Sequence, residues 1–247
     1  MIETTALILA AGKGTRMRSS TPKVLVPVSG RPLVFHLLET FERAGIDDRV
    51  LVVGHGADEV KATLGDGYRY VMQVEQKGMA HAVSMARPLL DVPDGPRRIV
   101  VTVGDSPLLR AETVEKLVGR HEEVGAACSF LTTVFEETPP YARVIRDSTG
   151  RVTGCVESHG ATLEELAVRE VLTSHFVFEA RALWENLDAI RPHPVTGELY
   201  LTDIVSILLD AGMTVEAIPV PDSAELLGLN TPEEVRWAES WLERHGG

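Results

Sequence analysis

The sequence predicts an α/β, Rossmann-like fold with a mostly parallel sheet flanked by helices and a small β-rich extension. Two observations lead to this fold class. In the first half of the chain, short apolar runs typical of buried strands alternate with helical patterns, whereas strand-like runs dominate between residues 130 and 177. Strands connected through helices form parallel sheets, and such sheets bind ligands beyond the carboxyl ends of their strands.

The expected elements follow these patterns in order. We expect strands over residues 6–10, 50–53, 70–74 and 99–103, with helices over 32–44, 58–64 and 80–90 between them. The strand-like runs from 130 to 177 suggest an insertion or a sheet extension over the site. Helices over 179–190 and 201–211 and a strand over 215–220 follow. Thr231 before Pro232 predicts the N-cap of a terminal helix that runs to Leu242.

Composition and charge exclude several classes of protein. A net charge of −12 argues against nonspecific binding of nucleic acid or of an anionic membrane, which depends on Lys and Arg. The apolar run 6–11 is too short to span a bilayer and has no basic stretch before it, so we expect a cytoplasmic protein without a signal peptide. Cys128 and Cys155 belong to no CxxC pattern and are expected to be buried, reduced thiols.

The segment after the first strand carries the strongest functional signal. Gly12 and Gly14 allow a tight turn in which backbone N–H groups face an anion. A Rossmann dinucleotide site would have a third glycine and a helix opening at the loop, and a P-loop would have Gly-Lys-Ser/Thr after four residues; neither pattern is present. A purely structural turn does not explain the four cations found within eleven residues: Lys13, Arg16, Arg18 and Lys23.

Longer motifs carry a resemblance to a known family. The segment from Leu9 to Met17, with Pro22-Lys23-Val24-Leu25 after it, resembles the signature of sugar-1-phosphate nucleotidyltransferases. Six further segments resemble the N-terminal uridylyltransferase domain of the bifunctional N-acetylglucosamine-1-phosphate uridylyltransferases: Val53-Gly54-His55-Gly56, Gln73-Val74-Glu75-Gln76, Gly104-Asp105 with Pro107-Leu108, Gly150 through Glu157, Gly197 through Ile204, and Gly228-Leu229-Asn230.

The resemblance covers nearly the whole chain and implies the nucleotide-diphospho-sugar transferase type of the fold. A single nucleotidyltransferase domain over residues 1–247 is implied, with a nucleotide-binding half over about 1–125, an acceptor-binding half over about 126–230 and a C-terminal helix over 231–247. No hexapeptide repeat is present, so the acetyltransferase half of that family is not expected. The oligomeric state is left open.

The same resemblance implies roles for individual residues. Asp105 and Asn230 correspond to ligands of Mg²⁺, which prefers a few protein oxygens together with phosphate oxygens and water. The residues expected to carry catalysis are Arg16, Lys23 and Asp105. The nucleotide is expected to contact Ala10, Ala11, Gly12, Lys13, Gly14, Thr15, Arg16, Gln73, Gly78 and Met79, and the acceptor Ala142, Glu157 and Leu172.

Several of these residues also have simpler interpretations. Asp105 could cap a helix, because Ser-Pro follows it, and Asn230 could belong to a plain Asn-Thr-Pro turn. Tyr200 and Asp203 are expected to be structural. His55 and His81 are expected to satisfy buried polar groups or to lie at the rim of the site, without a catalytic role.

The implied reaction is in-line attack by a sugar phosphate oxygen on the α-phosphorus of a nucleoside triphosphate, with pyrophosphate as leaving group and no covalent enzyme intermediate. An ionised acceptor needs no general base, so catalysis rests on positioning and on charge stabilisation. A non-catalytic sugar-nucleotide sensor with the same fold is the alternative. Joint retention of Lys23, Asp105 and Asn230 argues against a sensor.

Four departures from the family pattern concern specificity. This chain has Met79 and Ala80 where the family has Thr and Gly, and Val103 where the family has Tyr. It has Ala142 where the family has Gly, and Leu172 and Ser174 where the family has Asn and Gly. Loss of an amide at Leu172 would leave a buried sugar hydroxyl unpaired at a cost of about 1–3 kcal/mol. We therefore expect an acceptor other than N-acetylglucosamine 1-phosphate, such as another hexose phosphate, a deoxysugar or a carbocyclic analogue. Gln73 favours UTP, while GTP, dTTP and CTP stay open.

Overall fold

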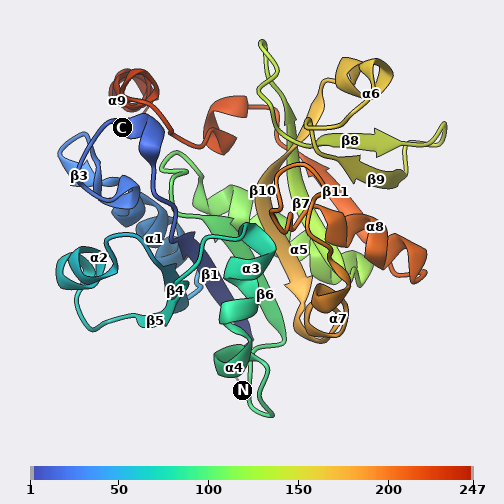
Figure 1. The fold of residues 1–247 in the computed structure, drawn as a ribbon, viewed down its shortest axis with the longest axis horizontal. Coiled ribbons are helices and arrows are strands. Elements are labelled where there is room, and N and C mark those ends of the chain that lie inside the picture. The colour runs from blue at the N-terminus through green and yellow to red at the C-terminus, as the bar shows by residue number, and fades with distance from the viewer. Residues whose placement is uncertain (1–2, 246–247) are drawn as a thin grey trace.

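The structure, a computed structural model that describes residues 3–245, is built around one mixed β-sheet (Figure 1). Its main path has the strand order β11-β7-β10-β6-β1-β4-β5. The bounds of these strands are Thr4–Ala10 (β1), Asp48–Val53 (β4), Arg69–Met72 (β5), Arg98–Val103 (β6), Cys128–Val134 (β7), Glu170–Glu179 (β10) and Val215–Pro219 (β11).

The strands are mostly parallel, as the sequence predicts. Strand β1 pairs in parallel with both β4 and β6, β4 with β5, and β11 with β7. Strand β10 runs antiparallel to both of its neighbours, β6 and β7. The fold class is confirmed as a mostly parallel, Rossmann-like sheet flanked by helices.

The β-rich region is a sheet extension rather than a separate insertion. Strands β7 and β10 belong to the central sheet, and a hairpin of β8 (Arg143–Arg146) and β9 (Val152–Val156) projects from β10 through the pairing of Val171 with Arg143. Helix α6 (Leu163–Ala167) lies beside this hairpin (Figure 1). A further two-stranded ribbon joins β2 (Pro27–Val28) to β3 (Arg31–Pro32).

Helices cover both faces of the sheet. One face packs against α1 (Leu33–Arg43), α2 (Ala57–Leu64) and α5 (Ala111–Val124), and the other against α3 (Met79–Met85), α4 (Arg87–Leu90), α7 (Ala180–Asn186) and α8 (Asp203–Asp210). Successive residues of β1 alternate between the two cores, since Leu7 packs in one and Ile8 in the other. Burial on both faces explains why the strand reads as a continuous apolar run.

Three expected elements differ in detail from the structure. The helix expected over 80–90 is broken at Ala86 into α3 and α4, because Pro88 has no N–H with which to continue the hydrogen-bond series of α3. The helix expected over 179–190 ends at Asn186 and continues as the 3-10 helix Leu187–Ala189. The strand expected over 70–74 ends at Met72. Helix α5 was not anticipated.

The terminal helix α9 (Pro232–His245) begins as predicted and runs three residues beyond Leu242. The Thr231 side chain accepts a hydrogen bond from the Glu234 N–H at 3.2 Å, and the Glu234 carboxylate accepts one from the Thr231 N–H at 2.9 Å, which together form a helix cap. Residues 1, 2, 246 and 247 of the expected domain lie outside the described residues.

Helix α9 packs on segments from the start of the chain (Figure 1). Its buried residues join a small apolar cluster composed of Met17, Val28, Leu33, Leu108, Leu229, Val235 and Ala238. This cluster holds the glycine loop, the turn after β6 and the segment before α9 together. None of the helices within residues 3–245 is both long enough and apolar enough to cross a bilayer.

Candidate active site

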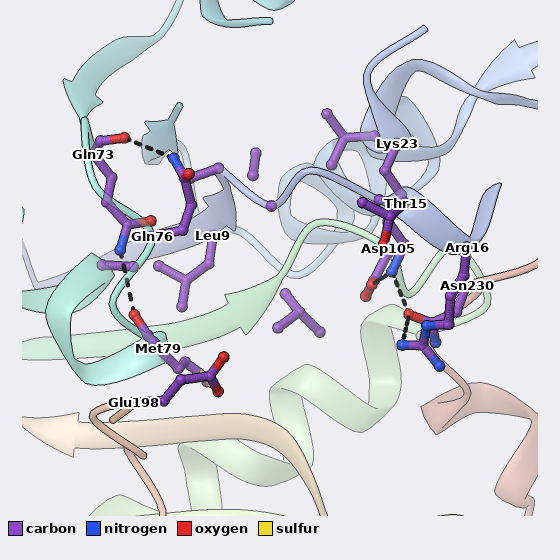
Figure 2. A pocket seen from close by; sticks show the side chains of 18 residues that line it. Leu9, Thr15, Arg16, Lys23, Gln73, Gln76, Met79, Asp105, Glu198 and Asn230 are labelled. Atoms are coloured by element: carbon purple, nitrogen blue, oxygen red, sulfur yellow. Dashed lines mark hydrogen bonds and ion pairs between the residues drawn. The ribbon is translucent and has the colours of Figure 1, made fainter. Parts of the chain in front are cut away.

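One cavity of the structure lies where the strand order reverses. Strand β1 has β4, the next strand along the chain, on one side and β6 on its other side. The carboxyl ends of β1 and β6 therefore border a crevice of the kind that binds ligands in open α/β sheets. A cavity of about 370 Å³ occupies this position. Ala10 and Ala11 line it at the end of β1, and Val103 and Asp105 line it at the end of β6. Figure 2 shows Asp105 in this place.

Most of the predicted nucleotide-binding residues line this cavity. They are Ala10, Ala11, Gly12, Gly14, Thr15, Arg16, Gln73, Gly78 and Met79, and Lys23, Asp105 and Asn230 join them. Lys13 does not line the cavity and is exposed. The sequence analysis missed six lining residues, namely Leu9, Val24, Gln76, Ala82, Val103 and Glu198. The ligand-binding roles assigned to the predicted residues stay predictions.

The glycine loop is shaped around Lys23. Gly14 has φ +59°, a left-handed conformation that side chains other than glycine rarely adopt. A Cβ at Gly14 would also lie 2.6 Å from the Cβ of Lys23, so the lysine stem passes directly over this glycine. A Cβ at Gly12 would meet no atom within 4 Å, which leaves that side of the loop open to the cavity.

At one end of the cavity, cationic and oxygen-bearing side chains converge (Figure 2). The Lys23 ammonium pairs with Asp105 Oδ2 and donates to Asn230 Oδ1 at 2.6 Å. The Arg16 guanidinium donates to the same Asn230 oxygen at 2.9 Å. Residues more than 200 positions apart in the chain thus share one polar cluster.

Asp105 is held by the segment that also carries Asn230. Its backbone carbonyl accepts a hydrogen bond from the Leu229 N–H at 2.9 Å, and its Oδ1 would lie 3.1 Å from a Cβ placed on Gly228. Helix α5 does not begin until Ala111, so the interpretation of Asp105 as a helix cap is wrong. The Asn230 amide nitrogen donates to the Gly228 carbonyl at 2.7 Å, which turns its oxygen toward Lys23 and Arg16.

These two side chains fit a divalent cation. Asp105 Oδ1 is buried and has no hydrogen-bond partner within residues 3–245, and Asn230 Oδ1 faces only cations. A carboxylate oxygen and an amide oxygen are ligands that Mg²⁺ accepts, with phosphate oxygens and water completing its shell.

Gln73 marks the opposite end of the cavity and is only 3% exposed. Its Nε2 donates to the Gly78 carbonyl at 3.3 Å and lies 3.0 Å from His81 Nδ1. Because a backbone carbonyl can only accept, the Gly78 contact fixes the amide orientation and leaves Gln73 Oε1 directed into the cavity (Figure 2). His81 thus satisfies a buried polar group, as expected.

The neighbouring loop at Gly78 is tied to the segment before α8. Gly78 has φ +103°, and a Cβ there would lie 2.6 Å from the Leu199 carbonyl oxygen. The Leu199 N–H donates a hydrogen bond to the Lys77 carbonyl at 2.8 Å, and the Leu199 carbonyl accepts one from the Ala80 N–H at 3.0 Å. This contact brings Glu198 to the cavity wall, a position that no local sequence signal indicates.

None of the three predicted acceptor residues is among those that line the cavity. Leu172 and Ala142 are 2% and 3% exposed and belong to the apolar core, where the Leu172 N–H donates to the Ala142 carbonyl at 3.0 Å. Glu157 follows β9 and accepts a hydrogen bond from the Thr202 hydroxyl. Burial raises the pKa of Glu157 above its ordinary value, and the Thr202 bond opposes that shift.

Comparison with known proteins places the chain in a family. Residues 6–195 match the model of the MobA-like NTP transferase domain. The chain belongs to this family. The Bifunctional protein GlmU of Heliobacterium modesticaldum is 40% identical over 98% of the chain and 53% of its own length, and that of Brevibacillus brevis is 41% identical over 97% and 51%. The chain therefore spans about half the length of these relatives.

Membership of the NTP transferase family agrees with the resemblance found in the sequence, which is confirmed. What the comparisons show for this chain is a MobA-like NTP transferase domain over residues 6–195.

One buried residue near the NTP transferase site was missed by the sequence analysis. His175 is 1% exposed, its Nδ1 lies 2.7 Å from the Thr102 hydroxyl, and its Nε2 has no partner within residues 3–245. Burial lowers the pKa of His175 to about 4, so its imidazole is neutral at pH 7. It follows Ser174, whose φ of +63° marks an irregularity in β10.

Proposed function

We propose that this protein is a Mg²⁺-dependent nucleotidyltransferase that joins a nucleoside triphosphate to a sugar 1-phosphate or a similar phosphate. The products are a nucleotide-activated sugar and pyrophosphate. One observation carries the proposal: Lys23, Arg16, Asp105 and Asn230 meet at one end of a cavity whose other end presents a buried amide. This arrangement suits a long ligand with phosphates at one end and a base at the other.

Charge explains why the cations are needed. Two unit charges of the same sign at 4 Å repel by about 4 kcal/mol with an effective dielectric constant near 20, so an anionic acceptor cannot approach a triphosphate unaided. Lys23 and Arg16 neutralise the phosphates from the side of the glycine loop. Mg²⁺ held by Asp105 and Asn230 would act as a Lewis acid that draws charge from the phosphate oxygens.

The proposed reaction is a single displacement at the α-phosphorus. An oxygen of the acceptor phosphate forms the new P–O bond, and the bond to the β-phosphate bridging oxygen breaks, so pyrophosphate leaves with the electron pair. The acceptor is ionised at neutral pH and gives up no proton. The protein therefore contributes position and charge: the loop at Gly12 and Gly14 presents backbone N–H groups, and Lys23 and Arg16 stabilise the transition state.

Gln73 supports UTP as the preferred nucleotide. Its Oε1 can only accept a hydrogen bond, and uracil offers an N3–H on its Watson–Crick edge. Thymine offers the same group and guanine an N1–H, whereas N3 of cytosine has no hydrogen. Cytosine can donate only through its N4 amino group. UTP is therefore preferred, and dTTP, GTP and CTP are its alternatives.

The acceptor is proposed to differ from N-acetylglucosamine 1-phosphate. Leu172 is packed in the apolar core and offers no hydrogen bond to a sugar hydroxyl. Glu157 still provides a partly buried carboxylate near the hairpin. A deoxysugar, another hexose phosphate or a carbocyclic analogue would avoid leaving a hydroxyl unpaired, which costs about 1–3 kcal/mol.

A pyrophosphate-release screen tests this function. Four nucleoside triphosphates are combined with a panel of sugar 1-phosphates, with and without Mg²⁺, and Asp105→Asn serves as the matched variant. We expect turnover with UTP and at least one acceptor, dependence on the metal, and a loss of about 100-fold or more in Asp105→Asn, as for removal of a strong electrostatic stabiliser. Nucleotide binding without turnover across the whole panel would contradict the proposal and favour a sensor.

A further inference from the structure

The Lys23 ammonium contacts both side chains that we assign to the metal, Asp105 and Asn230. It pairs with Asp105 Oδ2 and donates to Asn230 Oδ1 at 2.6 Å, and its side chain is only 11% exposed (Figure 2). Arg16 donates to the same Asn230 oxygen. Both side chains therefore already have a cationic partner within the protein itself.

The backbone around Lys23 is fixed, whereas its ammonium can move. Lys23 opens the 3-10 helix Lys23–Leu25, in which Val24 and Leu25 are buried, and the Leu25 N–H donates to the Pro22 carbonyl at 2.8 Å. Beyond Cβ, the lysine stem has rotatable bonds, so the charge can shift by several ångströms while the loop stays in place.

We propose that Lys23 is a tethered counter-ion that keeps the metal site closed until a triphosphate arrives. An ammonium and a divalent ion held by the same two side chains would lie within a few ångströms of each other and repel strongly, so binding of the ion favours displacement of the ammonium. A triphosphate changes the balance, since its oxygens give the displaced ammonium a new anionic partner. Lys23 is thus a positioning residue for Asp105 and Asn230 as well as a phosphate ligand.

The consequence is that metal and nucleotide bind cooperatively. A free divalent ion must displace Lys23 without compensation, so its affinity is low. A metal that arrives with a triphosphate displaces Lys23 onto the phosphates, so its affinity is higher, and by linkage the nucleotide gains the same factor. Asp105 Oδ1, which Lys23 leaves without a partner, keeps one acceptor ready for the incoming ion or its water.

This inference rests on the proposed function, and binding of Mn²⁺ to the nucleotide-free protein tests it separately. Mn²⁺ shares the preference of Mg²⁺ for carboxylate, carbonyl and water oxygens, and the free ion can be counted by its paramagnetic resonance. The proteins are the wild type, Lys23→Met, Lys23→Gln, Lys23→Arg and Lys13→Met. Lys23→Gln keeps a polar donor near Asp105 in case the Met variant fails to fold, and Lys13→Met removes an exposed charge from the same loop.

We expect Lys23→Met and Lys23→Gln to bind Mn²⁺ alone about tenfold more tightly than the wild type, the change that ~1.4 kcal/mol produces. Lys23→Arg and Lys13→Met should match the wild type within about twofold, because a solvated charge is screened and an arginine keeps the competing charge. A UTP analogue with a methylene group between its α- and β-phosphorus should tighten Mn²⁺ binding at least about fivefold in the wild type and less in Lys23→Met.

The outcomes separate the two proposals. Unchanged or weaker binding of Mn²⁺ alone to both neutral variants, with normal binding to the wild type plus analogue, would overturn the counter-ion role and leave the metal pair intact. Failure of every protein to bind Mn²⁺, with the analogue or without it, would overturn the metal pair and the counter-ion role together.

Discussion

Gly14 meets two separate demands at the phosphate end of the cavity, which makes it a sharper test than its neighbour Gly12. Its backbone is left-handed at φ +59°, and the stem of Lys23 crosses it with no room for a Cβ. Gly12 has open space where its Cβ would lie and needs no positive φ. The two glycines therefore differ in what they do, although they look alike in the sequence.

Gly14→Ala should lower the free energy of unfolding by about 1–2 kcal/mol, the cost of a left-handed residue other than glycine, and should reduce turnover because Lys23 is pushed aside. Gly12→Ala is the matched control. It should keep the stability within about 0.5 kcal/mol and weaken triphosphate binding only, since its methyl group would point into open cavity space. Denaturant unfolding and nucleotide titration measure the two effects; equal stability of the Gly14 variant and the wild type would contradict the account.

Strand β10 departs from regular pairing between Leu172 and Phe176, and this irregularity places His175 against Thr102 of β6. Ser174 supplies the turn with φ +63°, which a serine adopts at a cost. The strain and the buried imidazole lie in the strand that links the sheet to the hairpin of β8 and β9. Neither feature could be predicted from propensity, because both depend on the neighbouring strand.

Ser174→Gly should raise the free energy of unfolding by about 0.5–1 kcal/mol, because glycine adopts this backbone without strain. This net value allows for the conformational entropy that glycine adds to the unfolded chain, which opposes the gain. Val134→Gly, at an exposed and regularly paired position of β7, is the control and should lower stability. Thermal or urea unfolding compares the two. A loss of stability in both variants would show that Ser174 carries no backbone strain.

Other elements could be predicted from local patterns, and their limits have physical causes. Thr231 and Pro232 fixed the start of α9 because caps are local interactions. Helix α5 was missed although Val114, Leu117 and His121 are spaced to bury one face, since charged residues fill the positions between them. Pro88 is a local signal for the break between α3 and α4, because proline has no N–H to continue a helix.

The site as a whole needed information that no single segment contains. The glycine loop and its cations indicated phosphate binding from the sequence, but Asn230 reaches Lys23 across 207 positions only because Leu229 and Gly228 pack on Asp105. The family resemblance, not spacing, predicted that pair. Glu198 was missed because only the contact of Leu199 with the loop at Gly78 brings it to the cavity.

The molecule carries a net charge of −12, yet it must accept two anionic substrates. Positive charge is concentrated at one place, because the cations of the loop from Gly12 to Lys23 face Asp105 and Asn230, where a divalent ion would add to them. Attraction is therefore local, while the acidic remainder of the molecule repels other polyanions such as nucleic acids.

A crystal structure with Mn²⁺ and the methylene analogue of UTP tests this central claim most directly. The account predicts anomalous density for manganese in contact with the Asp105 and Asn230 side-chain oxygens, triphosphate density along the glycine loop, and the Lys23 ammonium moved onto phosphate oxygens. A triphosphate bound elsewhere, with the loop from Gly12 to Lys23 empty, would contradict the account.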